Sequence, residues 1–104
     1  MMPEVSHGRS SWWLTCATVD EARFGASRDA IIDALAASDI EARPVWKPMH
    51  RQPAFAGSRL ISRAGVTNST ADELFAHGIC LPSGSRLTAN ELERIVAVTR
   101  SVPR

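Results

Sequence analysis

Three prolines, Pro44, Pro48 and Pro53, stand close together near the middle of the 104-residue chain. Proline has no backbone N–H to donate, and it biases the residue before it towards extended geometry. A long helix or a central strand therefore cannot run through this region. The sequence predicts an ordered loop with little regular structure over residues 47–57, with regular elements on either side of it.

Two strands and a connection are predicted before the loop. Residues 12–19 are rich in aromatic and β-branched side chains and are short enough for a strand. Residues 20–26 are polar and contain a glycine, which favours a connection without regular structure. Residues 40–46 resemble a second strand. Because Pro44 cannot donate to a ladder, this strand is expected at an edge of its sheet.

A helix is predicted between these strands, over residues 28–38. Ser27 can cap its first turn through the side-chain oxygen. Three apolar residues then recur at helical spacing on one face, Ile31, Ile32 and Leu35. This face is expected to pack on the sheet.

Two capping boxes follow the loop. Thr70 with Glu73 predicts a helix that ends at His77, with Gly78 as its C′ residue, and residues 79–81 then form a strand. After a turn over residues 83–86, a second capping box, Thr88 with Glu91, opens a final helix to about residue 102. Its predicted buried stripe consists of four residues at i, i+3, i+4 and i+7, namely Leu92, Ile95, Val96 and Thr99.

The predicted order of elements is β-α-β-loop-α-β-α. It gives an α+β fold, a small two-layer domain in which about three helices pack on one face of a three-stranded sheet. Residues 1–10 are expected to be a flexible lead-in. Residues 11–104 then form a single domain, which agrees with a length sufficient for one core and too short for two.

Charge and cysteine usage exclude several classes of function. Twelve basic and eleven acidic residues give a net charge of +1, which predicts neither a nucleic-acid partner nor an anionic membrane surface. The absence of a long apolar run or a signal-peptide pattern predicts a cytoplasmic protein. Cys16 and Cys80 lie far apart in the sequence and are interpreted as buried thiols. No histidine pair has the spacing of metal ligands.

The sequence offers no catalytic constellation, and one segment stands out as a candidate binding site. Residues 43–55 combine cationic, amide and aromatic side chains on a proline-stiffened backbone, and the candidates are Arg43, Trp46, Lys47, His50, Gln52 and Phe55. A stiff loop lowers the ordering cost of binding, cationic donors can meet phosphate or hydroxyl oxygens, and aromatic side chains can bury a flat ring. The alternative interpretation makes Trp46 and Phe55 core residues. Composition alone does not separate the two.

Residues 40–55, IEARPVWKPMHRQPAF, and residues 71–96, ADELFAHGICLPSGSRLTANELERIV, resemble the C-terminal region of the DegT/DnrJ/StrS sugar aminotransferases. The SSWWLTCATVD strand resembles the one that opens the small domain in that family. The resemblance implies the C-terminal domain of a fold-type I, pyridoxal-phosphate (PLP)-dependent homodimeric enzyme. Such enzymes transfer an amino group, commonly from glutamate, to a keto group on a nucleotide-linked sugar. It further implies that the candidate residues lie near the mouth of an active site.

The resemblance also implies that the catalytic lysine and the PLP-binding large domain are absent from this chain. Its one lysine, Lys47, does not match the family's Schiff-base lysine. The chain is therefore expected to bind no cofactor alone and to be a fragment that is inactive by itself, with an upstream chain carrying the PLP domain as a partner. The alternative is a non-catalytic module that binds or senses a nucleotide sugar. Self-association is expected through an uncovered apolar surface formed by Trp12, Trp13 and Phe24.

Overall fold

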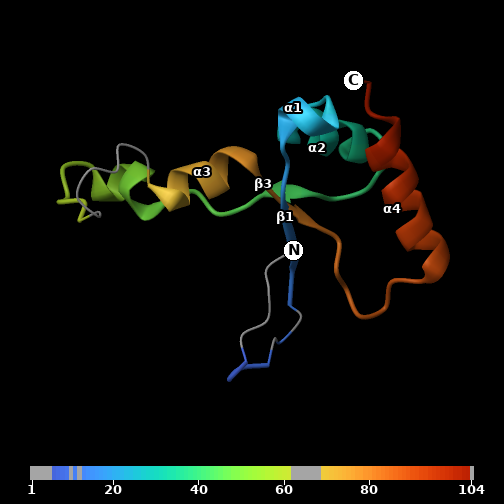
Figure 1. Ribbon diagram of the computed structural model, residues 1–104, viewed down its shortest axis with the longest axis horizontal. Coiled ribbons are helices and arrows are strands. Elements are labelled where there is room, and N and C mark those ends of the chain that lie inside the picture. The colour runs from blue at the N-terminus through green and yellow to red at the C-terminus, as the bar shows by residue number, and fades with distance from the viewer. Residues whose placement is uncertain (1–5, 10, 12, 62–68, 104) are drawn as a thin grey trace.

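The computed structural model describes residues 6–9, 11, 13–61 and 69–103. Figure 1 shows a small sheet with helices beside it and a long extension on one side. In chain order the elements are β1 (Thr15–Thr18), α1 (Glu21–Phe24), α2 (Arg28–Ala36), β2 (Arg43–Pro44), two single-turn 3-10 helices (Met49–Arg51 and Pro53–Phe55), α3 (Thr70–His77), β3 (Gly78–Leu81) and α4 (Ala89–Ser101). The α+β class and the three-stranded sheet predicted from the sequence are confirmed.

The sheet places the last strand of the chain in its centre. Its order is β1-β3-β2, and both pairs are antiparallel. Pro44 is opposite Ile79, and the next residue, Val45, donates its N–H to the Gly78 carbonyl at 3.1 Å. In an antiparallel ladder hydrogen-bonded and non-hydrogen-bonded pairs alternate, so Pro44 occupies a non-hydrogen-bonded pair. The predicted edge position is confirmed, and the ladder loses no bond to the proline.

The core lies between one face of the sheet and the helices α2 and α4. Its buried residues are Ala26, Ile31, Leu35, Ile40, Ile79, Ile95 and Val102. Ser27 caps α2 as predicted, since its Oγ accepts from the Ala30 N–H at 3.2 Å. The capping box of Thr88 and Glu91 opens α4, also as predicted.

The predicted stripe of α4 is wrong in part. Ile95 is 8% exposed, but Leu92 and Val96 are 48% and 45% exposed. The helix instead turns Ile95, Val98 and Val102 towards the core. Both sets have helical spacing, and periodicity alone cannot choose between overlapping faces of one helix. The packing of α4 against α2 determines which face of α4 is buried.

Three local expectations need correction. Residues 20–26 contain the one-turn helix α1, whose Asp20 side chain accepts from the Arg23 N–H and which ends at Gly25 with φ 91°. The cap of α3 is Ser69, one residue before the predicted Thr70. Gly78 has extended geometry and continues directly into β3, so it does not form a left-handed C′ turn. Short polar side chains compete for caps at adjacent positions, and sequence does not rank them.

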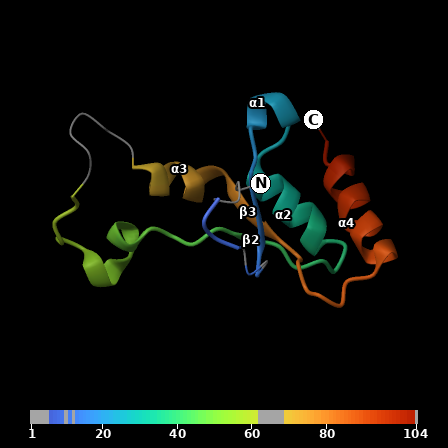
Figure 2. The same ribbon diagram turned by 60° about the horizontal axis from the view of Figure 1, so that its bottom comes forward.

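The largest departure concerns α3, which does not pack on the sheet. Figures 1 and 2 show α3 and the two 3-10 helices extending away from the sheet, and α3 has no buried residue. We call the described residues 47–61 and 69–77 the arm, and the described residues 13–46 and 78–103 the body. The radius of gyration is 16.1 Å, larger than the roughly 13 Å of a compact domain of this length. None of the helices in the described ranges has the length and apolarity of a membrane-spanning segment.

Candidate functional site

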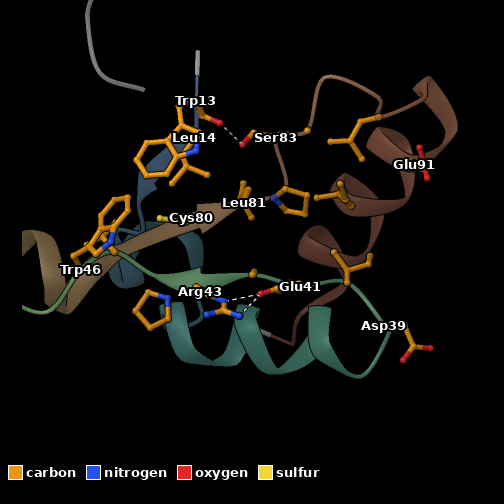
Figure 3. Close-up of a pocket in the computed structure, with 18 of the residues that line it drawn as sticks. Trp13, Leu14, Asp39, Glu41, Arg43, Trp46, Cys80, Leu81, Ser83 and Glu91 are labelled. Carbon is orange, nitrogen blue, oxygen red and sulfur yellow. Dashed lines mark hydrogen bonds and ion pairs between the residues drawn. The ribbon is translucent and has the colours of Figure 1, made fainter. Parts of the chain in front are cut away.

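The two faces of the sheet differ in what covers them. Side chains alternate along a strand, so Ile79 and Ala17, which pack in the core, point away from the face that carries Cys16 and Cys80. This second face, which we call the open face, borders a broad concave surface of about 1210 Å³. The surface is walled by the segment before β1, by β2 and its flanks, by β3 with the turn after it, and by α4 (Figure 3).

Two tryptophans stand at one end of the concave surface. Trp13 lies before β1 and Trp46 follows β2, and their ring centroids are 5.8 Å apart with planes tilted by 37°. Their exposed fractions are 71% and 63%. A tilted pair of this kind is a favourable aromatic contact, but it leaves most of each ring uncovered. Exposed flat rings beside a concavity can stack on a ligand ring or be covered by another protein segment.

Charged groups line the same surface. Arg43 forms an ion pair with Glu41, with Nη2 and Oε1 at 2.5 Å, and both side chains are more than 70% exposed. An exposed pair of this type stabilises the fold little, so the guanidinium can turn to an anion at small cost. Lys47 lies nearby in the wall, and Arg86 and Arg94 lie on the α4 side. The surface thus offers cations next to aromatic rings.

Glu91 also lines this surface, but its carboxylate belongs to the capping box that opens α4. The Thr88 N–H donates to Glu91 Oε2 at 2.7 Å and the Thr88 hydroxyl donates to the same oxygen at 2.8 Å. The bond from the Thr88 backbone, followed by that from its hydroxyl, lowers the pKa of Glu91. Glu91 is therefore a structural carboxylate, and we assign it no role in acid–base chemistry.

His50, one of the predicted site residues, lies on the arm. Its Nε2 is 3.1 Å from both carboxylate oxygens of Asp72, and Arg51 binds the same carboxylate. Ser69 donates its hydroxyl to Asp72 Oδ2 at 2.7 Å. The Ser69 bond and then Arg51, working against partial burial, lower the pKa of Asp72 to about 2. This cluster, the Asp72 cluster, holds the first 3-10 helix against the start of α3.

Gln52 also makes contacts within the arm. Its Nε2 donates to the Lys47 carbonyl at 3.1 Å and contacts the Met49 sulfur at 3.5 Å. Phe55 is 36% exposed on the second 3-10 helix. The structure therefore divides the six predicted site residues into two groups. Arg43, Trp46 and Lys47 line the concave surface, whereas His50, Gln52 and Phe55 lie along the arm. Their role in binding stays a prediction.

Sequence reasoning missed several parts of the concave surface. Leu14 lines it beside Trp13, and the Ser83 hydroxyl donates to the Trp13 carbonyl at 3.1 Å, joining the turn after β3 to the segment before β1. From the sequence, Ser83 is predicted to lie in a turn, and no local pattern predicts its contact with Trp13. Of the three residues expected on an uncovered surface, Trp13 is exposed, Phe24 is half-buried against the core, and Trp12 lies outside the described residues. The expectation for Phe24 is wrong because α1 turns it inwards.

The described part of the chain thus combines a small sheet packed on one face by α2 and α4, an arm, and a concave surface with exposed rings and cations. The profile of the DegT/DnrJ/EryC1/StrS aminotransferase family matches residues 1–100, and the chain belongs to this family.

Two curated relatives match almost all of the chain. It is 45% identical over 97 residues to a putative pyridoxal phosphate-dependent aminotransferase, EpsN, of Bacillus subtilis (strain 168), with 93% of this chain and 24% of the relative covered. It is 30% identical over 95 residues to a GDP-perosamine synthase of Caulobacter vibrioides, with 91% of this chain and 24% of the relative covered. The chain therefore spans about a quarter of the length of these relatives.

Proposed function

We propose that the chain is the C-terminal small domain of a PLP-dependent aminotransferase that transfers an amino group, commonly from glutamate, to a keto group of a nucleotide-linked sugar. The observation that carries the proposal is the 45% identity to a relative named as a PLP-dependent aminotransferase, over 93% of this chain. The substrate class is supported by the name of the Caulobacter relative, which is that of a synthase of a GDP-linked sugar.

The concave surface supplies the chemistry that such a substrate needs. A nucleotide sugar carries a flat base, two anionic phosphates and several hydroxyls. Trp46 presents a flat ring, and Arg43 and Lys47 present cations in the same wall. Charge-assisted bonds to phosphate are strong and directional, most of all from arginine. We assign these three residues to substrate binding, at a face that the remainder of the enzyme completes.

PLP itself does not fit the residues of this chain. The cofactor supplies the electron sink for transamination, and holding it requires a lysine amine in a site shielded from water. The one lysine, Lys47, is exposed between Trp46 and Pro48. We therefore expect PLP to be held by the rest of the complete enzyme, in line with a chain that spans 24% of its PLP-dependent relative.

The cofactor expectation has a direct test. Incubation of the isolated chain with PLP, followed by borohydride reduction and mass spectrometry, is expected to give no stoichiometric adduct at Lys47. An acetylated N-terminus removes the competing α-amino group in a parallel sample. A full-occupancy adduct at Lys47 would contradict the assignment of PLP to another part of the enzyme.

The activity is tested in a chimaera. The matched segment of the Caulobacter GDP-perosamine synthase is replaced by this chain, and glutamate-dependent formation of the amino sugar is measured. We expect turnover to persist. Arg43→Ala and Lys47→Ala should each raise KM for the sugar nucleotide by roughly 10- to 100-fold, because each removes one charge-assisted bond. The value of kcat should change little, because such bonds are made equally in the ground and transition states.

Two outcomes decide between this function and another. A folded, PLP-loaded chimaera without amination would contradict the proposal. Binding of a nucleotide sugar by the isolated chain, read by quenching of its tryptophan fluorescence, would instead favour a non-catalytic binding module. The exposure of both rings beside Arg43 and Lys47 is the observation that supports this second candidate.

Self-association through Trp13 is a further proposal, tested by light scattering of the wild-type chain and Trp13→Ser.

A further inference from the structure

Two thiols face each other across the pair of strands β1 and β3, although 64 positions separate them in the sequence. Cys16 of β1 and Cys80 of β3 are register partners in the antiparallel ladder. Their sulfur atoms are 3.5 Å apart, and both are free thiols. Each residue is half-buried, and Cys80 lies in the wall of the concave surface (Figure 3).

The hydrogen-bond pattern of the ladder shows which kind of pair these cysteines occupy. Val19 donates its N–H to the His77 carbonyl at 2.9 Å, which makes residues 19 and 77 a hydrogen-bonded pair. Pairs alternate along an antiparallel ladder, so residues 17 and 79 are also hydrogen-bonded and residues 16 and 80 are not. Opposed residues in a non-hydrogen-bonded pair have Cα atoms about 4.5 Å apart. That spacing lies within the range of disulfides, about 4.4–6.8 Å.

We propose that Cys16 and Cys80 form a dithiol modification site, which a small-molecule disulfide such as oxidised glutathione converts into a cross-strand disulfide. One cysteine thiolate attacks the glutathione disulfide, forms a mixed disulfide and releases one glutathione thiol. The second cysteine then attacks the protein sulfur of the mixed disulfide and releases a second glutathione thiol. Two protein thiols are oxidised and one glutathione disulfide is reduced, so atoms and electrons balance.

The surroundings determine how fast such a site reacts. Burial, followed by the contact with Cys16, raises the pKa of Cys80 to about 11. The thiolate is the attacking species, so Cys80 is a slow first nucleophile at neutral pH, and Cys16 is expected to form the mixed disulfide. The neighbouring sulfur at 3.5 Å makes the second step intramolecular and fast compared with the first. The expected product is therefore the internal disulfide, without accumulation of glutathione adducts.

The test is a redox titration of the whole chain. Reduced protein is equilibrated with graded ratios of oxidised to reduced glutathione, remaining thiols are alkylated, and intact masses and peptide maps are recorded. We expect the internal Cys16–Cys80 disulfide to form, and its equilibrium constant to be at least tenfold larger in buffer than in concentrated urea, because only the fold holds the sulfurs together. Addition of excess reduced glutathione should regenerate both thiols.

Single-cysteine variants provide the control. Cys16→Ser and Cys80→Ser are each expected to give only a glutathione adduct on the remaining cysteine. The proposal is overturned if the wild-type chain accumulates adducts without closing the internal bond, if it gives disulfide-linked dimers instead, or if its equilibrium constant is the same in buffer and in urea. The inference rests on the strand register and the distance between the two sulfur atoms, and it does not depend on the proposed enzymatic function.

Discussion

The body and the arm are held together by different kinds of interaction. In the body, seven apolar residues form a continuous core between the sheet and the helices α2 and α4. In the described part of the arm, Pro48 is the only buried residue, and polar contacts around Asp72 join the first 3-10 helix to α3. Arg28 joins the two regions, since it binds the Phe75 carbonyl and its guanidinium carbon lies 5.7 Å from the centroid of the Phe75 ring.

The two regions also differ in how much apolar surface they bury. Burial of apolar surface is the main source of folding free energy, and the body contains nearly all of it. The arm exposes apolar side chains without covering them, among them Met49, Leu60, Ile61 and Leu74. Exposed apolar side chains that lie close together are typical of a surface that contacts another protein segment. The apolar core of the body therefore contains no residue of the arm, whereas the arm leaves apolar side chains available for contact with another surface.

The largest effect is expected from a core truncation in the body. Leu35 is fully buried on α2, at 0% exposure. Leu35→Ala should lower the free energy of unfolding by about 2–5 kcal/mol, because it removes buried methyl groups and leaves a cavity. The matched control is Leu74→Ala in the arm, where the side chain is 42% exposed, and its expected loss is below about 1 kcal/mol. Urea unfolding followed by circular dichroism measures both. Equal losses would contradict the contrast between the two regions.

A second, smaller effect is expected at the junction of the arm and the body. Gly78 ends α3 and begins β3, and an added Cβ would meet the Leu74 carbonyl oxygen as well as Val45 Cγ2 at 2.6 Å. Gly78→Ala should therefore cost roughly 1–3 kcal/mol through overpacking. Gly84→Ala is the control, because a Cβ there meets no atom within 4 Å. Thermal unfolding of both variants tests the prediction, and an unchanged midpoint for Gly78→Ala would refute it.

The same two regions differ in how far sequence alone could describe them. Capping signals and periodicity predicted α2 and the start of α4, because a cap and the turn it opens are local in sequence. The edge position of β2 was also predictable locally, because Pro44 itself has no N–H to donate to a second neighbouring strand. In the arm, the capping signal that predicted α3 contained no information on where the helix lies. Its direction depends on long-range contacts such as that of Arg28 with Phe75.

The candidate site was predictable in part. The composition of residues 43–55 identified Arg43, Trp46 and Lys47, which do line one surface. It could not show that His50 and Gln52 are engaged within the arm, since their partner groups, Asp72 and the Lys47 carbonyl, are specified by geometry. The contact of Cys16 with Cys80 depends on a strand register across 64 positions, which no local pattern reveals.

A local effect of pH is expected in the arm. The pKa of Asp72 is about 2 in the folded chain and 3.8 for an unperturbed aspartate. A lowered pKa means that the carboxylate stabilises the arm fully above about pH 4, and that this stabilisation is lost as the pH falls towards 2. Hydrogen exchange at α3, relative to α2, should therefore increase over this range. Asp72→Asn should remove most of the pH dependence, and an unchanged dependence in that variant would assign it to another group.

The smallest effect is expected from the ion pair of Arg43 with Glu41, a charged contact in the body that can be compared with the Asp72 cluster of the arm. Arg43 and Glu41 form an ion pair in which the side chains are 76% and 72% exposed, whereas the Asp72 side chain is only 14% exposed. Water screens the exposed pair, so Arg43→Ala should change the free energy of unfolding by less than about 0.5 kcal/mol. Glu41→Gln is the matched control, because it removes the same pair from the other side and leaves the arginine in place. Both variants should unfold within error of the wild-type chain, at low and at high salt, in urea titrations. A loss above 1 kcal/mol for both would mean that the pair stabilises the edge strand itself. In that case Arg43 would stabilise the body in the way that Asp72 stabilises the arm. The increase in KM expected for Arg43→Ala would then have to be corrected for loss of stability before it is attributed to substrate binding.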